Sequence, residues 1–363
     1  MKHILHVVGA RPNFIKAAPV LRALAARKGV RQTLVHTGQH YDVNMSDVFF
    51  RQLGMPKPDV SLGVGSGTHA AQTAQVLLGL EPVLLERKPD VVVVYGDVNS
   101  TMAAALAAVK LHIPVAHVEA GLRSGDREMP EEINRIITDA ISDILFTPSK
   151  DGDENLLKEG VPKKKIRFVG NAMIDTLIRL LPAARRPAEP RLEGRYVLVT
   201  VHRPANTDDP RGLANLMRAL AAISKLAPVV FPIHPRTRAR LDKAGFKAPA
   251  GGRLLLVEPL GYLEFLALQR DAALVVTDSG GIQEETTYLG VPCLTVRTTT
   301  ERPVTVAAGT NTLVRDYSSL PREAAAALKR ARKPAKSPKF WDGKAGERVA
   351  DGLLTWLAQR RAA

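Results

Sequence analysis

The sequence of 363 residues has one cysteine and few aromatic residues, which make up 5% of the chain. A single thiol excludes an intramolecular disulfide. Cys293 lies within the apolar run 291–296, so we interpret it as a buried structural thiol. The nine histidines form neither an H-E-x-x-H motif nor a cluster with cysteine. We therefore expect no protein-bound metal.

Long hydrophobic runs are absent as well. No stretch approaches the ~20 apolar residues that a membrane span requires. The apolar run at residues 3–8 is shorter than the hydrophobic core of a signal peptide. We interpret it as a first buried strand, and we expect a cytoplasmic protein with no membrane partner.

The net charge of +15 is compatible with a nucleic acid, an anionic surface or a small anionic substrate as partner. The basic residues are scattered, with modest runs only at 162–165 and 328–333. Few aromatic side chains are present on which nucleic-acid bases would stack. We expect most of this charge on solvated helix faces and expect no nucleic-acid partner.

Short β-branched runs alternate with helical patterns in two parts of the chain, which is typical of βαβ units and parallel sheets. Strands are expected at residues 3–8, 32–36, 90–95, 114–119, 144–147, 196–201, 229–233, 253–257, 274–277 and 293–296. Helices are expected at residues 14–27, 69–86, 100–111, 130–142, 211–225, 262–270, 281–289, 321–333 and 346–357.

A proline-rich stretch without apolar periodicity, residues 181–190, separates the two parts. We therefore predict an α/β protein with two Rossmann-like, doubly wound domains at residues 1–170 and 171–345. A C-terminal helix in residues 346–363 is expected to pack back on the first domain. Two such domains facing each other would place strand ends and helix N-termini on opposite walls of one cleft.

The first strand runs into the turn Gly9-Ala10-Arg11-Pro12, which opens a helix. Gly9 allows a tight turn and Pro12 suits the first helical position. Arg11 and Lys16 then lie near a helix N-terminus, where backbone N–H groups favour an anion and a guanidinium adds paired phosphate contacts. The alternative role of Arg11 is a surface ion pair.

A second turn of this kind contains Ser279, Gly280 and Gly281 after the predicted strand 274–277. Small side chains let the backbone N–H groups approach a phosphate. Glu285 lies one turn inside the helix, where we expect it to accept hydrogen bonds from ribose hydroxyls. A capped helix with an acidic first turn is the alternative interpretation.

Carboxylates directly follow two predicted strands, at Asp97 and Glu119. Because the carboxyl ends of parallel strands line one crevice, both side chains are expected to point into it. Desolvation and mutual repulsion can raise a pKa there and create an acid–base pair. Glu131 follows near the start of the predicted helix 130–142, where a favourable first-turn charge is its alternative role.

Further polar residues lie at strand ends in the second part of the chain. His202 follows the strand 196–201 and is suited to bonding a phosphate or hydroxyl, although a lone histidine there is often structural. His234 and Arg302 lie in loops at the same edge and are expected to line the site. The D-x-D pattern at residues 151–153 is interpreted as the acidic start of a helix, and not as a metal motif.

Seven segments together resemble the non-hydrolysing UDP-N-acetylglucosamine 2-epimerases, and they occur in the order typical of that family. They are residues 9–16, 96–97, 117–124, 130–135, 169–171, 277–285 and 300–303. The resemblance implies a glycosyltransferase-B-like fold, usually a homodimer. It also implies interconversion of UDP-N-acetylglucosamine and UDP-N-acetylmannosamine without a redox cofactor.

In that family UDP is eliminated to leave 2-acetamidoglucal and is then added back with C2 inverted. The resemblance implies Asp97, Glu119 and Glu131 as proton-transfer groups at C2, with the face that each serves left open, and His202 beside the leaving group. It implies substrate contacts for Arg11, Lys16, Arg123, Asn171, His234, Ser279, Gly280, Gly281, Glu285 and Arg302.

The sequence departs from the family pattern in three places. Asn206 is kept, but the acid that commonly precedes it is replaced by Ala205, and Val304 stands where many members have Glu. The loop 37–42 retains Gln39 and His40 but diverges where some bacterial members build an allosteric second substrate site. We do not expect allosteric control, and the departures are compatible with a modified sugar.

Three other functions are compatible with parts of this pattern. Hydrolytic epimerisation would release free N-acetylmannosamine, but Arg11-Pro12 together with Lys16 is closer to the non-hydrolysing branch. A metal-independent glycosyltransferase can share the fold, yet the first domain shows no amphipathic insertion for an acceptor site. A non-catalytic sensor of nucleotide sugars would not need three carboxylates and His202 at strand ends.

Overall fold

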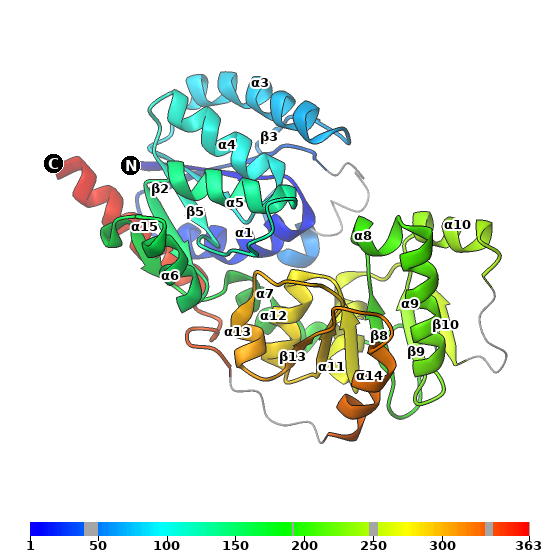
Figure 1. The fold of residues 1–363 in the computed structure, drawn as a ribbon. Helices are drawn as coiled ribbons and strands as arrows, with labels where there is room; N and C mark the ends of the chain where they lie inside the picture. The colour runs from blue at the N-terminus through cyan, green and yellow to red at the C-terminus, as the bar shows by residue number, and fades with distance from the viewer. Residues whose placement is uncertain (40–49, 191, 247–252, 331–336, 363) are drawn as a thin grey trace. The chain divides into compact units, whose positions relative to one another are not determined.

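The computed structural model describes residues 1–39, 50–190, 192–246, 253–330 and 337–362, so residues 40–42 of the predicted divergent loop lie outside it. The chain divides into two compact units, residues 1–179 with 339–363 and residues 180–338 (Figure 1). The boundaries expected at 170/171 and 345/346 differ from these. The reason is that α7 (Ala172–Leu180) packs on the first unit, where Thr176 Oγ1 donates to Ile15 O at 2.7 Å.

Seven parallel strands form the sheet of the first unit, in the order β3-β2-β1-β4-β5-β6-β7. They are β1 (Lys2–Val8), β2 (Val30–His36), β3 (Val60–Ser61), β4 (Val91–Tyr95), β5 (Val115–Val118), β6 (Ile144–Thr147) and β7 (Ile166–Phe168). The helices besides α7 are α1 (Arg11–Ala25), α3 (His69–Arg87), α4 (Asn99–Lys110), α5 (Pro130–Ile141), α6 (Lys150–Lys158), the 3₁₀ turn η1 (Lys163–Lys165) and α15 (Ala345–Ala362).

The strand order reverses between β1 and β4, which are neighbours in the sheet. All five residues of β4 are fully buried, as expected of a parallel strand covered on both faces. Leu5 and Val7 of β1 share a core with Val92 and Val94 of β4 and with side chains of α3 and α4. Open α/β sheets bind ligands at such a reversal, outside the carboxyl ends of the strands.

The C-terminal helix α15 packs on α1 within the first unit (Figure 1). Gly346 permits this contact, because a Cβ there would lie 2.7 Å from the backbone of Pro19. The Asp175 carboxylate accepts a hydrogen bond from Gly346 N at 2.7 Å, and burial raises the pKa of Asp175 to about 6. Trp341 Nε1 donates to Pro148 O at 3.1 Å and anchors the segment that leads into α15.

Six parallel strands form the second sheet, in the order β10-β9-β8-β11-β12-β13. They are β8 (Val197–Thr200), β9 (Val229–Pro232), β10 (Leu254–Val257), β11 (Leu274–Thr277), β12 (Cys293–Thr295) and β13 (Asn311–Leu313). The helices are η2 (Leu181–Ala183), α8 (Pro204–Thr207), α9 (Pro210–Ile223), α10 (Pro235–Lys243), α11 (Tyr262–Asp271), α12 (Gly280–Leu289), α13 (Pro303–Ala307) and α14 (Leu320–Lys329).

Two hydrophobic clusters cover the two faces of the second sheet. Val197 and Val199 of β8 belong to one cluster and Leu198 to the other, which follows from the alternation of side chains along a strand. Cys293 is buried, and burial raises the pKa of its thiol to about 11. A thiol with so high a pKa is unreactive, in keeping with a structural role.

The predicted fold class, an α/β protein with two Rossmann-like, doubly wound units, is confirmed. Within the described ranges, no helix combines the length and apolar content needed to cross a membrane. In the same part of the chain, no three residues among His, Cys, Asp and Glu are grouped as metal ligands.

Candidate functional site

The turn between β1 and α1 is held by one asparagine side chain. Asn13 Oδ1 accepts from Gly9 N at 3.0 Å and Ala10 N at 3.1 Å, and its Nδ2 donates to Tyr95 O at 2.7 Å. Gly9 is needed for close packing and not for a left-handed turn, because a Cβ there would overlap the Ser100 side chain. Arg11 opens α1 and is exposed, in the position predicted for an anion contact.

Lys16 does not face solvent at the start of α1. Its Nζ lies 2.7 Å from Glu119 Oε1, and both side chains are only 5% exposed. Gly96 leaves room for this lysine, since a Cβ at Gly96 would lie 2.7 Å from Lys16 Nζ. Glu119 has a left-handed backbone with φ of 75°, a strained conformation that often marks a functional position. The structure thus brings Lys16 and Glu119 together next to the turn that carries Asp97.

Asp97 forms an ion pair with a buried arginine of α5. Arg135 Nη1 contacts Asp97 Oδ2, and Arg135 Nη2 lies 2.6 Å from Glu132 Oε2. The Arg135 guanidinium is 2% exposed, whereas the Asp97 side chain is 21% exposed. Glu131, the third predicted acid, is half-buried in the first turn of α5. Asp97 therefore has an accessible edge and a buried counter-ion.

A chain of charged groups links the end of β5 to α6. His117 Nδ1 lies 2.6 Å from Asp139 Oδ1, and Arg123 Nη1 lies 2.7 Å from Asp139 Oδ2. Burial acts to raise the pKa of Asp139, but the charges and hydrogen bonds of His117 and Arg123 outweigh it and hold the pKa below its usual range. Arg123 also pairs with Glu159 at 2.7 Å. The guanidinium of Arg123, predicted to bind substrate, is thus engaged by two protein carboxylates.

Asn171 lies at the start of α7 and serves the helix itself. Its Oδ1 accepts from Met173 N at 2.9 Å, as a helix-capping side chain does. Its Nδ2 is buried and has no hydrogen-bond partner within the described ranges. The predicted substrate contact of Asn171 stays a prediction.

A buried aspartate that the sequence interpretation missed organises the site of the second unit. The Asp278 carboxylate accepts from His202 N at 3.1 Å, Arg203 N at 2.8 Å and Asn206 Nδ2 at 2.8 Å. His202 Nδ1 lies 3.1 Å from Asp278 Oδ1, and the His202 side chain is 61% exposed. Burial acts to raise the pKa of Asp278, but these interactions outweigh it and lower the pKa. The contact through Nδ1 therefore holds the His202 ring in place, and the rest of the ring is exposed to solvent.

Ser279 caps α12 without a side-chain cap hydrogen bond, and its N–H is taken by Thr277 Oγ1 at 3.0 Å. The first N–H groups of α12 are therefore suited to an anion. Gly280 is required for a reason other than phosphate access. A Cβ at Gly280 would overlap the Glu301 carboxylate.

Two buried ion pairs hold the loop 297–303, one within the loop and one between the loop and this helix. Arg297 Nη1 lies 2.7 Å from Glu301 Oε2, and Arg302 Nε lies 2.9 Å from Glu284 Oε1. Arg302, which was predicted to bind substrate, is 5% exposed and pairs with Glu284, and its substrate contact stays a prediction. Arg297 was not predicted, because its partner is recognisable only in the folded chain.

Glu285 is buried on α12, and its Oε1 accepts from Tyr262 OH at 2.8 Å. Its Oε2 is buried and has no hydrogen-bond partner in the part of the chain that the structure describes. Burial raises the pKa of Glu285 to about 7. A carboxyl group with one unused oxygen suits a ligand that donates hydrogen bonds.

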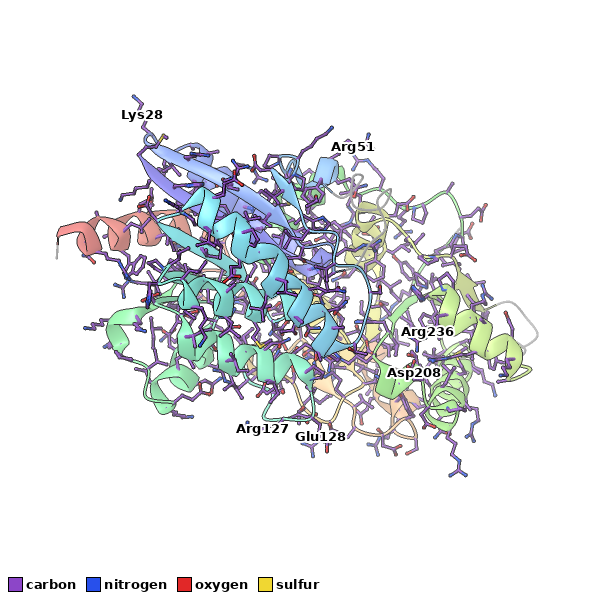
Figure 2. The ribbon with its side chains drawn as sticks, turned by 90° about the horizontal axis from the view of Figure 1, so that it is seen from above. Lys28, Arg51, Arg127, Glu128, Asp208 and Arg236 are labelled. Carbon is purple, nitrogen blue, oxygen red and sulfur yellow. The ribbon has the colours of Figure 1, made fainter. Side chains whose placement is uncertain are left out.

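His234 caps α10, where its Nδ1 accepts from Arg236 N at 3.2 Å. Arg236 in turn lies 3.0 Å from Asp208, and both side chains are labelled in Figure 2. The His234 side chain is exposed, so its predicted contact with a ligand stays open.

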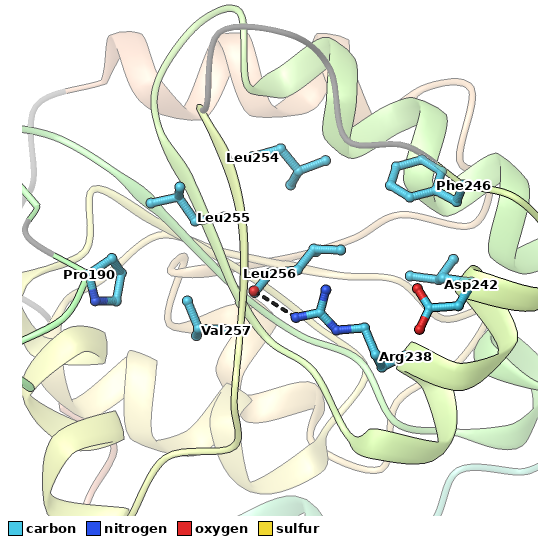
Figure 3. A pocket seen from close by; sticks show the side chains of 9 residues that line it. Pro190, Arg238, Asp242, Phe246, Leu254, Leu255, Leu256 and Val257 are labelled. Atoms are coloured by element: carbon cyan, nitrogen blue, oxygen red, sulfur yellow. Dashed lines mark hydrogen bonds between the residues drawn. The ribbon is translucent and has the colours of Figure 1, made fainter.

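A separate pocket of about 320 Å³ lies along β10 (Figure 3). Arg238 crosses it and donates to Leu256 O at 2.9 Å. Its lining includes Leu254, Phe246 and Asp242 but none of the residues predicted from the sequence to bind substrate. The predicted residues of this unit instead follow the ends of β8, β9, β11 and β12.

Comparisons with known proteins point to one family over most of the chain. The family model described as UDP-N-acetylglucosamine 2-epimerase matches residues 22–354. The UDP-N-acetylglucosamine 2-epimerase of Methanocaldococcus jannaschii is 44% identical over 361 residues, which cover 96% of this chain and 98% of that protein. The UDP-2,3-diacetamido-2,3-dideoxy-D-glucuronate 2-epimerase of Pseudomonas aeruginosa is 47% identical over 314 residues, which cover 86% and 88%.

The crystal structure of the M. jannaschii UDP-GlcNAc 2-epimerase in complex with UDP-GlcNAc and UDP is similar in fold. The TM-score is 0.89 at 44% identity, and the match covers 98% of this chain and 100% of that chain. Fold and strand-end sites thus define a glycosyltransferase-B-like α/β protein with two doubly wound units. The chain belongs to the UDP-N-acetylglucosamine 2-epimerase family, as its motifs predicted.

Proposed function

We propose that the chain interconverts UDP-N-acetylglucosamine and UDP-N-acetylmannosamine by inverting C2 of the sugar. The observation that carries the proposal is the pair of carboxylates at adjacent strand ends, Asp97 after β4 and Glu119 after β5, each beside a buried cation. Family membership supports the same reaction.

The first unit supplies the proton transfers. A carboxylate takes the proton from C2, and the electrons of the C2–H bond form a double bond between C1 and C2. The C1–O bond breaks at the same time, and its electrons leave with UDP. The product is 2-acetamidoglucal. The reverse sequence adds a proton to the opposite face of C2 and reattaches a UDP oxygen to C1. Proton transfer by positioned carboxyl groups contributes ~100- to 10,000-fold to such reactions. Asp97, Glu119 and Glu131 are the proposed groups, with their faces unassigned.

The second unit binds UDP in this proposal. The first N–H groups of α12, at Gly280 and Gly281, meet the pyrophosphate next to Ser279, with His202 beside the leaving oxygen. Glu285 accepts hydrogen bonds from the ribose hydroxyls.

A second substrate deserves a direct assay because of one relative. The P. aeruginosa protein named as acting on a UDP-linked diacetamido-glucuronate is 47% identical to this chain. Inversion at C2 would use the same carboxylates, so the difference would lie in the pocket around the rest of the sugar. We propose UDP-N-acetylglucosamine as the substrate and the UDP-linked diacetamido-glucuronate as the second candidate.

Proton NMR of purified protein with each nucleotide sugar tests the proposal. Formation of UDP-N-acetylmannosamine supports it, whereas free N-acetylmannosamine with UDP indicates the hydrolysing reaction. An unchanged UDP-N-acetylglucosamine with epimerised diacetamido-glucuronate would select the second substrate. No reaction with either, together with transfer of the sugar to an acceptor, would favour a glycosyltransferase. Asp97→Asn serves as the inactive control.

The homodimer implied by the family resemblance is proposed to form through α3. Leu78 and Leu85 lie two helical turns apart on this helix and are 73% and 55% exposed. Two exposed leucines at this spacing lie on one side of the helix, where a second subunit would cover them. Light scattering should give a dimer for the wild type and a monomer for L78E/L85E. The predicted cytoplasmic location stays a prediction.

A further inference from the structure

Arg135 is an arginine of α5 whose charge is almost entirely removed from water. Its side chain is 2% exposed, and two carboxylates surround it, Asp97 and Glu132. A buried cation is stable only when its hydrogen bonds and its charge are both satisfied. The two carboxylates differ in exposure, because Asp97 is partly accessible and Glu132 is buried.

Glu132 is the fixed end of this group. Besides Arg135 Nη2 at 2.6 Å and Nε at 3.0 Å, its carboxylate accepts from Ser124 N at 3.0 Å and Gly125 N at 2.8 Å. Burial acts to raise the pKa of Glu132, but these hydrogen bonds and the charge of Arg135 outweigh it and lower the pKa. Glu132 is therefore an ionised anchor with 2% exposure.

Asp97 is the accessible end, with 21% of its side chain exposed. Its backbone is held as well, because Asn134 Nδ2 donates to Asp97 O at 2.9 Å. On the other side of the turn, His117 Nδ1 contacts Asp139 Oδ1, and His117 Nε2 lies 2.8 Å from Gly96 O. Both the carbonyl and the carboxylate of Asp97 are thus fixed by adjacent residues of α5.

We propose that Arg135 is the positioning residue of the epimerase reaction that orients the Asp97 carboxylate for proton transfer at C2. The inference rests on the proposed function. Arg135 itself does not touch the substrate. Its planar guanidinium contacts both Glu132 and Asp97. Because backbone N–H groups hold Glu132 in place, Glu132 fixes the guanidinium, and the guanidinium in turn fixes the orientation of the Asp97 carboxylate.

The charges around Asp97 predict what loss of Arg135 would do. Without the guanidinium, the Asp97 and Glu132 carboxylates would face each other with no cation between them, and repulsion would favour protonation of one. Lys16, Glu119 and His117 also face this turn from α1 and β5, and they would be unchanged. The fall of turnover toward low pH should therefore begin at a higher pH than in the wild type.

The test compares R135Q and R135K with the wild type by kcat, KM and UDP affinity across pH. R135Q should lower kcat about 100-fold, the scale of a misplaced catalytic group, with KM and UDP affinity little changed. Its acid limb of kcat should move to higher pH. R135K should return that limb toward the wild-type position, because the charge is restored. It should regain kcat only in part, because an ammonium lacks the planar fork.

R27Q is the matched control, since the Arg27–Asp351 pair lies on the surface at 2.7 Å and is far from this chemistry in sequence and role. It should behave as the wild type. D97N/R135Q tests whether Arg135 acts through Asp97, and it should equal D97N in kcat. If R135Q is too unstable, R135K keeps a cation between Asp97 and Glu132 and carries the test. A further loss in the double variant, or near-normal kcat in R135Q, would overturn the inference. A wild type that leaves the C2 proton untouched would instead overturn the proposed function itself.

Discussion

Lys16 Nζ lies 2.7 Å from Glu119 Oε1, and both side chains are 5% exposed. The pair joins a helix that starts at the predicted anion-binding turn to the strand end that carries a proposed acid. A buried ion pair of this kind adds little net stability over an apolar pair, but breaking it leaves one charge buried alone.

Lys16→Met should therefore destabilise the fold by about 3–5 kcal/mol, because Glu119 would lose its buried counter-ion. Urea unfolding measures this change. K16M/E119Q should regain part of the loss, since both charges are then removed. R27Q breaks a surface pair whose side chains are 39% and 62% exposed, and it should cost less than about 1 kcal/mol. Equal losses for K16M and R27Q would contradict the buried pair.

Asp97→Asn and Glu119→Gln keep the shape of each side chain and remove its basicity. Each should lower turnover ~100- to 10,000-fold, the usual contribution of a general acid or base. UDP binding should change little, because neither group is proposed to contact the pyrophosphate. Calorimetric titration with UDP alongside the kinetics separates the two effects, and near-normal turnover in either variant would make that residue structural.

Gly280→Ala should weaken UDP binding and lower stability by about 1–3 kcal/mol, the usual cost of overpacking. The added Cβ would overlap the Glu301 carboxylate, so the loop 297–303 would have to move. Melting temperature with and without UDP is the measurement. Gly67→Ala is the control, because its nearest neighbours would lie 3.8 Å away. Unchanged UDP affinity in G280A would show that the loop contact is not part of the site.

Glu285 predicts a pH dependence with a definite sign. Burial raises its pKa from 4.5 to about 7, so the stability it contributes to the free protein is present in full below pH 4.5 and is lost as the pH rises through about 7. Ribose hydroxyls that donate to Glu285 favour its ionised form. UDP affinity should therefore rise as the pH increases toward about 7 and level off above it.

Titration of UDP into wild type and E285Q across this range isolates the carboxyl group. The comparison is needed because a terminal phosphate itself titrates near pH ~6. The difference between the two proteins should grow with pH up to about 7, and pyrophosphate, which lacks ribose, should show none. Equal losses for UDP and pyrophosphate in E285A would refute the ribose contact.

The fold was predictable where the elements are long and strongly patterned. The uniform apolar run of β4 marked a central strand, and prolines marked the linker at residues 181–190. The strands β3, β7 and β13 were missed because two or three residues hold too little pattern, and pairing with a neighbouring strand defines them. The helix α10 was missed because its charged sequence has little apolar periodicity.

The site was predictable only in part. Asp97, Glu119 and the turn at Ser279 follow strands, and that rule needs no knowledge of partners. The same rule would have found Asp278, which follows β11 directly. Arg135 gave no such signal, because it pairs with Asp97 38 residues away and the contact exists only after folding.

Proton exchange at C2 tests the central claim most directly. The protein is incubated with UDP-N-acetylglucosamine in heavy water, and the C2 position of the product is followed by NMR. Carboxylic acids at an accessible site exchange their proton rapidly with solvent, so the account predicts UDP-N-acetylmannosamine that carries deuterium at C2. Product with an unlabelled C2 would contradict proton transfer by Asp97, Glu119 or Glu131.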